Sequence, residues 1–199
     1  MNAFFRFRLM IMMLSTALYL LFAGGCAGPV GKETAVFDAA ELKPGLSVLY
    51  LDGGYRFVKQ IPKGTKAKKK GRPGEPVMQI NHQFGTGEVF DSGRSRKIGV
   101  LLDGYIQFDR SGTYALQALS NDGVEVYVDG KLIVSDPNVH SDRLSDVGEY
   151  TSEQGGWQPL HIRYFQRKGS AALKLYWRPP GTTEFEIVPV QAYGHFESQ

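Results

Sequence analysis

Residues 120–131 read SNDGVEVYVDGK, and this stretch decides the fold. The valines of VEVYV, residues 124–128, alternate with Glu125 and Tyr127, which is the period of two that a half-buried strand requires. Asp-Gly follows at 129–130, ahead of a second apolar run. Because a type I′ turn needs positive φ at two successive residues, Asp-Gly between two such runs predicts a β-hairpin.

The same alternation recurs along the chain on both sides of this hairpin. Further strands are expected over residues 47–51, 98–108, 113–119, 160–165, 172–177 and 185–190. Within them, Asp103-Gly104 indicates a turn or bulge, and alternation puts Trp177 on the core side with Leu173 and Leu175. Apolar residues show no sustained helical spacing after residue 26. Many short strands separated by Gly, Pro and Asn predict an all-β fold, an antiparallel β-sandwich or a barrel.

Composition limits the remaining possibilities. The chain has 199 residues, of which 42% are hydrophobic, so it can bury a core and wholesale disorder is excluded. Its single Cys excludes an intrachain disulfide and a zinc site built on several thiolates. No internal repeat or shift of composition marks a second folded domain, so one domain is expected.

The first 25 residues have the layout of a secretory signal peptide. Arg6 and Arg8 precede the apolar run LMIMMLSTALYLLF at 9–22, and small residues follow at 23–25. The apolar run is too short to span a bilayer comfortably, which takes roughly 20 residues. We therefore predict that residues 1–25 form a signal peptide.

Cys26 directly follows these small residues, and the junction resembles the cleavage box of bacterial lipoproteins. The resemblance implies that the Cys26 thiol carries a diacylglyceryl group, with residues 26–43 as a lipidated tether to a membrane of the bacterial cell envelope. Two or more acyl chains give a lasting anchor. Ala27 stands where an Asp would retain such a protein in the inner membrane, which favours the outer membrane. The alternative is plain secretion with an ordinary thiol.

Residues 53–74 depart from the strand pattern. They contain no acid and eight basic residues: Arg56, Lys59, Lys63, Lys66, Lys68, Lys69, Lys70 and Arg72. With several Gly and Pro, the segment is expected to be a flexible loop or hairpin tip. The Lys63–Arg72 loop could hold the domain against an anionic surface, or it could be a solvated tip. The formal net charge of +3 falls to +1 once Arg6 and Arg8 are removed, and we expect no nucleic-acid partner.

Four stretches, in order, resemble the protective-antigen-type β-sandwich domain, the PA-fourteen family. They are Gly45-Leu46 with Tyr50, Gly104–Phe108 followed by Ser111–Tyr114, Ser120–Gly123 followed by Val126–Lys131, and Leu160–Phe165 with Gly169, Ala172–Trp177 and Pro179–Gly181. The resemblance implies that the sandwich occupies residues 44–193. It also implies a binding domain and not an enzyme, and the sequence contains no G-x-S-x-G, P-loop or G-x-G-x-x-G motif.

The resemblance also points to site residues. In the carbohydrate-binding fungal adhesins of this family, two adjacent Asp residues bind calcium and contact the sugar, at the position of Asn121-Asp122. It therefore implies Asn121 and Asp122 as calcium ligands, and Asn121 departs from the pattern by one negative charge, which lowers calcium affinity. Read without the family, Asn-Asp-Gly is equally a loop that needs short polar side chains and positive φ.

Gly123 and Trp157 extend the candidate ligand-binding set, which is then Asn121, Asp122, Gly123 and Trp157. Trp157 follows Gly155-Gly156 and could stack on a sugar. We thus expect a membrane-anchored, non-catalytic module that binds carbohydrate or cell-envelope glycan. The alternative is a structural or protein-interaction lipoprotein of the cell envelope without a sugar site.

Overall fold

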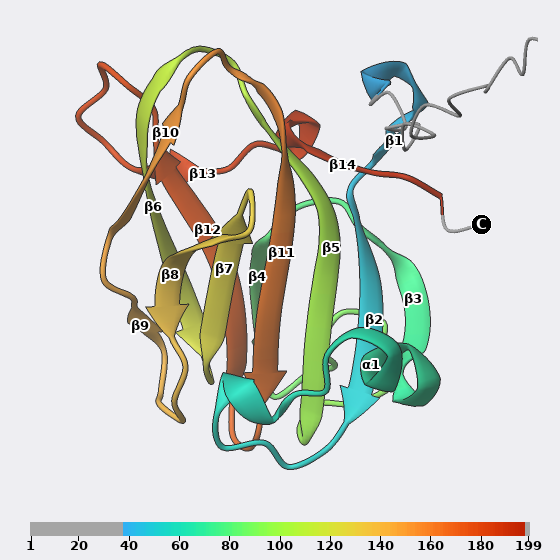
Figure 1. The fold of residues 1–199 in the computed structure, drawn as a ribbon. Helices are drawn as coiled ribbons and strands as arrows, with labels where there is room; N and C mark the ends of the chain where they lie inside the picture. The colour runs from blue at the N-terminus through green and yellow to red at the C-terminus, as the bar shows by residue number, and fades with distance from the viewer. Residues whose placement is uncertain (1–37, 198–199) are drawn as a thin grey trace, which may run out of the picture. The chain divides into compact units, whose positions relative to one another are not determined.

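The structure is a computed structural model that describes residues 38–197. These residues form two antiparallel β-sheets packed face to face, so the predicted β-sandwich is confirmed (Figure 1). The predicted signal peptide and Cys26 lie outside the described residues. Among the described residues, no helix is long and apolar enough to cross a membrane.

The first sheet has eight strands and is organised around β5 (Ile98–Phe108) and β11 (Gly156–Gln166). Its main path runs β1 (Lys43–Pro44), β14 (Tyr193–His195), β5, β11, β7 (Val124–Val128) and β8 (Lys131–Asp136), while β2 (Leu46–Asp52) pairs with both β5 and β3 (Arg72–Val77). One edge of β5 therefore has two partners, since β2 covers Ile98–Asp103 and β14 covers Tyr105–Ile106.

Gly104 lies where this edge of β5 changes partner. The predicted turn or bulge at Asp103-Gly104 is wrong, because β5 runs through both residues and its register with β11 does not shift there. Gly104 has φ +159°, and a Cβ there would stand 2.4 Å from the carbonyl oxygen of Gly194. Only glycine lets β14 approach β5 this closely.

The second sheet has six strands. Its main path is β10 (Gly148–Ser152), β6 (Gly112–Asn121), β12 (Ala171–Arg178) and β13 (Glu186–Ile187), with β4 (Asn81–Gly85) paired to β12 and β9 (Arg143–Leu144) paired to β6. The strand expected over 185–190 is thus only two residues long, and the 3₁₀ helix η3 (Val190–Ala192) follows it. A further 3₁₀ helix, η1 (Ala39–Glu41), precedes β1.

The main core lies between the two sheets and follows the predicted alternation. Phe108 of the first sheet contacts Tyr114 of the second, with ring centroids 4.5 Å apart, and both are buried. Trp177 is 5% exposed beside them, so its predicted place in the core is confirmed. The hairpin is confirmed as well, because Asp129 and Gly130 have φ of 49° and 71°.

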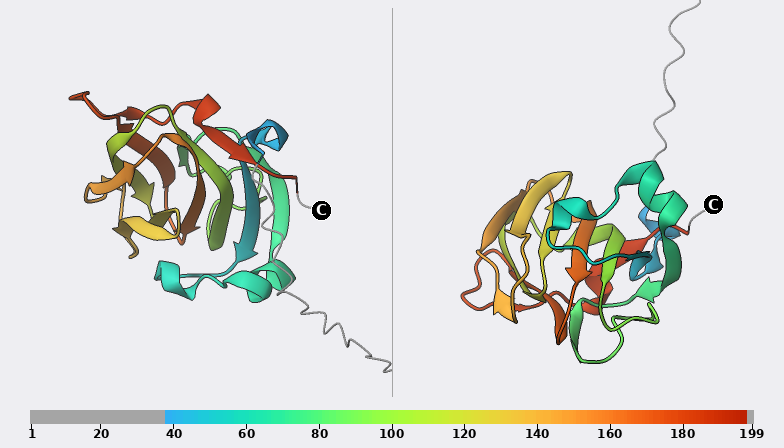
Figure 2. Two further views of the ribbon diagram at one scale, coloured as in Figure 1. Left: turned by 45° about the horizontal axis from the view of Figure 1, so that its top comes forward. Right: turned by 90° about the horizontal axis from the view of Figure 1, so that it is seen from below.

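A second, smaller core lies on the outer face of the first sheet. It consists of Leu51, Val58, Ile61, Ala67, Leu101 and Phe165. The covering residues belong to η2 (Val58–Gln60) and α1 (Gly64–Lys70), and Figures 1 and 2 show both on the side of the first sheet that faces away from the second.

The predicted flexible basic loop is therefore wrong for this part of the chain. Its helix was invisible in the sequence because α1 buries a single side chain, Ala67, which gives no apolar period. Arg163 of β11 also holds this segment by hydrogen bonds, since its Nη2 donates to the carbonyl oxygens of Val58 and Ile61 at 2.9 and 2.8 Å. The basic segment is thus held against the sheet.

Candidate functional site

Asn121 and Asp122 lie at the end of β6, just before β7, and the peptide bond between them is cis. Both residues are buried, at 5% and 1% exposed. The Tyr164 hydroxyl donates to the Asn121 carbonyl oxygen at 2.5 Å. The predicted pair is therefore part of the packed end of the sandwich.

The Asp122 carboxylate ties this end of the sandwich together. Its Oδ1 accepts from the backbone N–H of His140 at 3.2 Å, and its Oδ2 accepts from the backbone N–H of Arg167 at 2.7 Å. Position 123 has no room for a side chain, because a Cβ there would stand 2.7 Å from Phe165 and from the backbone of Pro137. Both residues thus have structural roles that account for their identity.

The Asn121 amide faces another side chain. Its Nδ2 donates to Asp142 Oδ1 at 2.7 Å and to Ser170 Oγ at 3.2 Å. Gln83 Nε2 donates to the other oxygen of Asp142 at 2.7 Å. These two hydrogen bonds hold the pKa of the Asp142 carboxyl below its ordinary value, so Asp142 accepts both bonds as an anion at neutral pH.

This arrangement offers few carboxylates to a calcium ion. Calcium takes six to eight oxygen ligands, usually with several carboxylates. Within residues 38–197, no three His, Cys, Asp or Glu side chains gather around a point that could hold a metal. The amide nitrogen of Asn121 already donates a hydrogen bond to the Asp142 carboxylate, and both oxygens of Asp122 accept hydrogen bonds from backbone N–H groups.

Trp157 does not join Asn121 and Asp122. It pairs with Gln107 at the start of β11, whereas Asp122 bonds to Phe165 near the end of that strand. Eight residues separate Trp157 from Phe165, which is roughly 26 Å along a strand. The structure therefore separates Trp157 from the rest of the set expected from the sequence.

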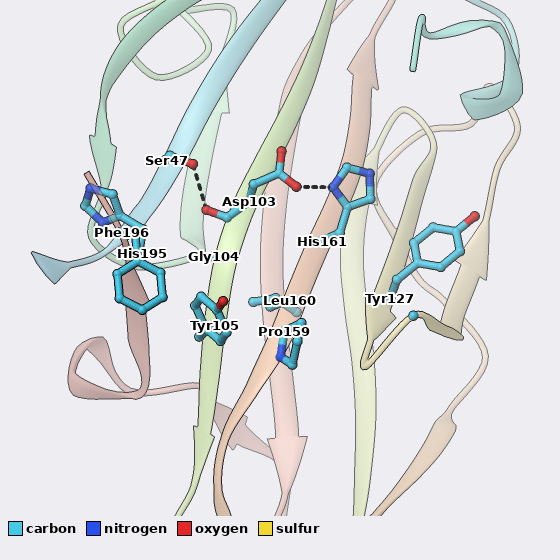
Figure 3. Close-up of a pocket in the computed structure, with 11 residues that line it drawn as sticks. Ser47, Asp103, Gly104, Tyr105, Tyr127, Pro159, Leu160, His161, His195 and Phe196 are labelled. Atoms are coloured by element: carbon cyan, nitrogen blue, oxygen red, sulfur yellow. Dashed lines mark hydrogen bonds and ion pairs between the residues drawn. The ribbon is translucent and has the colours of Figure 1, made fainter. Parts of the chain in front are cut away.

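A pocket lies instead on the outer face of the first sheet, in the part that η2 and α1 leave uncovered. Strand register aligns four residues across β2, β5, β11 and β7: Ser47, Asp103, His161 and Tyr127. Their side chains share one face because directly paired residues point the same way. All four line the pocket, whose volume is about 510 Å³ (Figure 3).

Asp103 and His161 form the polar centre of this pocket. Figure 3 shows the two side chains pointing toward each other, with Asp103 Oδ1 2.6 Å from His161 Nδ1. The Tyr127 ring lies 5.9 Å from the His161 ring, and its hydroxyl donates to Glu125 at 2.8 Å. Burial and the Glu125 carboxylate raise the pKa of Tyr127, so its hydroxyl remains a donor.

Apolar and aromatic groups form most of the remaining lining, together with His195, whose Nδ1 lies 3.0 Å from the carbonyl oxygen of Gly45. The Tyr105 and Phe196 rings meet edge to face with centroids 5.4 Å apart, and Pro159 lies beside Tyr105 across the strand pair. Alternation along β11 puts Trp157 on this same outer face, one step beyond Pro159. The pocket thus combines ring faces with a few polar groups, as ligand pockets commonly do.

Comparison with known proteins decides the family. The profile of the PA14 domain matches residues 68–191, more than half of the chain. The chain belongs to the PA14 domain family. This confirms the family expected from the sequence, while a comparison with curated proteins finds no significant match.

Solved structures share the fold of this PA14 domain. An anti-sigma factor domain-containing protein from Clostridium clariflavum superposes with a TM-score of 0.64 at 22% identity, over 79% of this chain and 49% of that one. This chain thus spans about half the length of that relative. The PA14 sugar-binding domain from an RTX adhesin superposes with a TM-score of 0.56 at 21% identity, over 76% of this chain and 98% of that one. The epithelial adhesin 9 A domain from Candida glabrata, solved with Galβ1-4GlcNAc, superposes with a TM-score of 0.62 at 12% identity, over 80% of this chain and 92% of that one.

The pocket of this PA14 domain holds a carboxylate–imidazole pair, yet it lacks the geometry of a serine hydrolase. Ser47 Oγ donates to the backbone oxygen of Asp103 at 2.8 Å. Ser47 and His161 flank β5 on opposite sides, so at about 4.8 Å per strand they stand about 10 Å apart. A nucleophile must lie within hydrogen-bond reach of its base. The pair therefore suits hydrogen bonding to a ligand.

Sequence reasoning missed Asp103, His161, Tyr127 and Tyr105. The available signal was the polar half of each alternating strand, because these residues occupy outward positions in register across β5, β11 and β7. Register between distant strands is not readable from one sequence. The site of this PA14 domain becomes visible only once the sheet is assembled.

Proposed function

We propose that this PA14 domain is a non-catalytic glycan-binding module, with the sugar held in the outer-face pocket. The observation that carries the proposal is the Asp103–His161 pair flanked by aromatic rings. A sugar presents hydroxyl groups at its edge and C–H groups on its faces. The pair supplies an acceptor and an imidazole for the hydroxyls, and Tyr105, Tyr127 and Phe196 supply ring surface for the C–H faces.

The relatives support carbohydrate as the ligand class. Two of them carry sugar binding in their descriptions, one as a sugar-binding domain and one in complex with a disaccharide. Calcium has no part in the proposal, because the Asn121–Asp122 loop lacks a donor set for it. The sugar is expected to bind equally well with and without a chelator.

The test is a glycan array probed with the full-length protein in detergent, followed by titration of the best-retained sugar. Asp103→Ala and Tyr127→Ala should each weaken binding about tenfold or more, because each removes a hydrogen-bonding or stacking group. Glu184→Ala, which removes an exposed acid outside the pocket, is the matched control. Retention of no glycan would refute the proposal and favour the protein-interaction alternative. Full binding by Asp103→Ala would refute the outer-face pocket as the site of the sugar.

We further propose that Cys26 anchors this module to the outer membrane by covalent lipid. The support is the run of small residues that ends at Cys26 after an apolar segment. The anchor would present the glycan pocket at the surface of the cell envelope. Metabolic labelling with an alkyne fatty acid in a bacterial host should tag the wild type and leave Cys26→Ser untagged, and an untagged wild type would contradict the anchor.

A further inference from the structure

A second cavity of about 890 Å³ adjoins the pocket of Figure 3. It lies between the outer face of the first sheet and α1, with Leu49, Leu101 and Arg163 on the sheet side. The two cavities share Ser47, Asp103, Tyr127 and His161. The two cavities therefore lie side by side on the outer face and meet at this row of residues, and we name them together the outer groove.

The α1 end of the outer groove is basic. Lys63 and Lys68 line it, and residues 53–74 carry eight basic side chains and no acid. Ala67, 2% exposed, packs against the sheet between these lysines and fixes α1 in place. The positive charge is thus held at one wall of the groove instead of being spread over a solvated loop.

The floor of the groove adds to this fixed geometry. Arg163 is 1% exposed, donates to the carbonyl oxygens of Val58 and Ile61, and lies 3.2 Å from Glu125. Its charge is balanced by Glu125, so it acts as a positioning residue for the covering segment. The charge that remains for a ligand at this end comes from the lysines.

The opposite end of the outer groove has a different character. There, Asp103 stands next to His161, and the remaining lining is mostly aromatic or apolar, with Tyr105 and Phe196. A ligand that fits the whole groove is therefore uncharged where it meets the rings and anionic where it meets Lys63 and Lys68. A flat lipid surface would meet the outward lysines of α1, but it does not enter a concave groove.

We propose that the outer groove binds an acidic oligosaccharide, with a carboxylate, sulfate or phosphate group placed between Lys63 and Lys68. This inference rests on the proposed glycan function and names the class of glycan. Charge-assisted hydrogen bonds from lysine to such a group are stronger than bonds between neutral partners. An acidic sugar should accordingly bind more tightly than the neutral sugar of the same backbone.

The experiment measures binding of matched pairs of oligosaccharides that differ only in one acidic group, on the array and by titration. The wild type should prefer the acidic member of a pair about tenfold or more. Lys63→Ala with Lys68→Ala should remove that preference while retaining the neutral sugar. The matched control is Lys69→Ala with Lys70→Ala, which removes equal charge from α1 at residues that do not line the groove and should keep most of the preference.

The outcomes separate the groove from its alternatives. Equal binding of acidic and neutral members would overturn the inference and leave the glycan function standing, whereas loss of all sugar binding would refute the function itself. Equal loss in both double variants would indicate long-range attraction and not a groove. A further experiment compares binding of the protein to phosphatidylglycerol vesicles with binding to phosphatidylcholine vesicles. Binding to the anionic vesicles but not to the acidic sugars would overturn the inference in favour of a lipid surface.

Discussion

Replacing Asn121 with aspartate tests how the loop at the end of β6 is held together. The substitution keeps the size of the side chain but turns the donor that serves Asp142 and Ser170 into an acceptor. A lost hydrogen bond to a charged group costs about 1.5–3 kcal/mol. The Ser170 hydroxyl can rotate and donate to the new carboxylate, whereas that carboxylate repels Asp142. Since Asp142 is exposed, solvent screens part of the new repulsion, and we expect Asn121→Asp to lower the free energy of unfolding by roughly 2–4 kcal/mol.

Urea unfolding at pH 7, followed by tryptophan fluorescence, measures this loss. In a thermal melt it corresponds to a fall of roughly 4–16 °C for a domain of this size. The matched control exchanges the two side chains, Asn121→Asp with Asp142→Asn, which restores a donor–acceptor pair and leaves an acceptor for Gln83. The exchange should recover at least half of the lost stability. A single variant within about 0.5 kcal/mol of the wild type, or an exchange that recovers nothing, would refute the reasoning.

Three further predictions concern protonation, a buried ion pair and calcium. Burial lowers the pKa of His82 below its ordinary value of 6.5, so His82 contributes stability that is present above about pH 6.5 and is lost as pH falls through the lowered pKa. The urea midpoints at pH 7.5 and pH 5 should therefore differ less in His82→Phe than in the wild type. An equal difference in the two proteins would contradict this. Arg163→Met should lower the free energy of unfolding by about 3–5 kcal/mol, because it leaves the Glu125 carboxylate without its cation and the Ile61 carbonyl oxygen without its donor, and urea unfolding with less than about 1 kcal/mol of loss would rule out that role. Millimolar calcium should leave the melting temperature of the wild type unchanged relative to a chelator, whereas a rise that disappears in Asp122→Ala would show that the loop binds the metal.

The fold was predictable because its evidence is local. The alternation at 124–128 and the Asp-Gly turn specify a hairpin without any knowledge of the rest of the chain. Trp177 was placed in the core by the same period of two. The helix α1 escaped prediction because it is seven residues long and buries one alanine, so tertiary packing and not amphipathic pattern specifies it.

The site was less predictable because it depends on pairing between distant strands. Asn121 and Asp122 stood out as a motif, and the structure gives both a network of hydrogen bonds. Asp142, the partner of Asn121, lies in a polar stretch whose path across the sandwich no local pattern reveals. Asp103 and His161 are 58 positions apart and meet only through the register of β5 with β11.

The central claim is that the sugar occupies the outer-face pocket and not the Asn121–Asp122 loop. The most direct test is a titration of the isotope-labelled protein with the best-retained glycan, followed by nuclear magnetic resonance at each backbone amide. We expect the largest shifts at the amides of Asp103, Tyr127 and His161, with the amides of Asn121 and Asp122 unchanged. Shifts that gather at the loop and leave the pocket unchanged would contradict it.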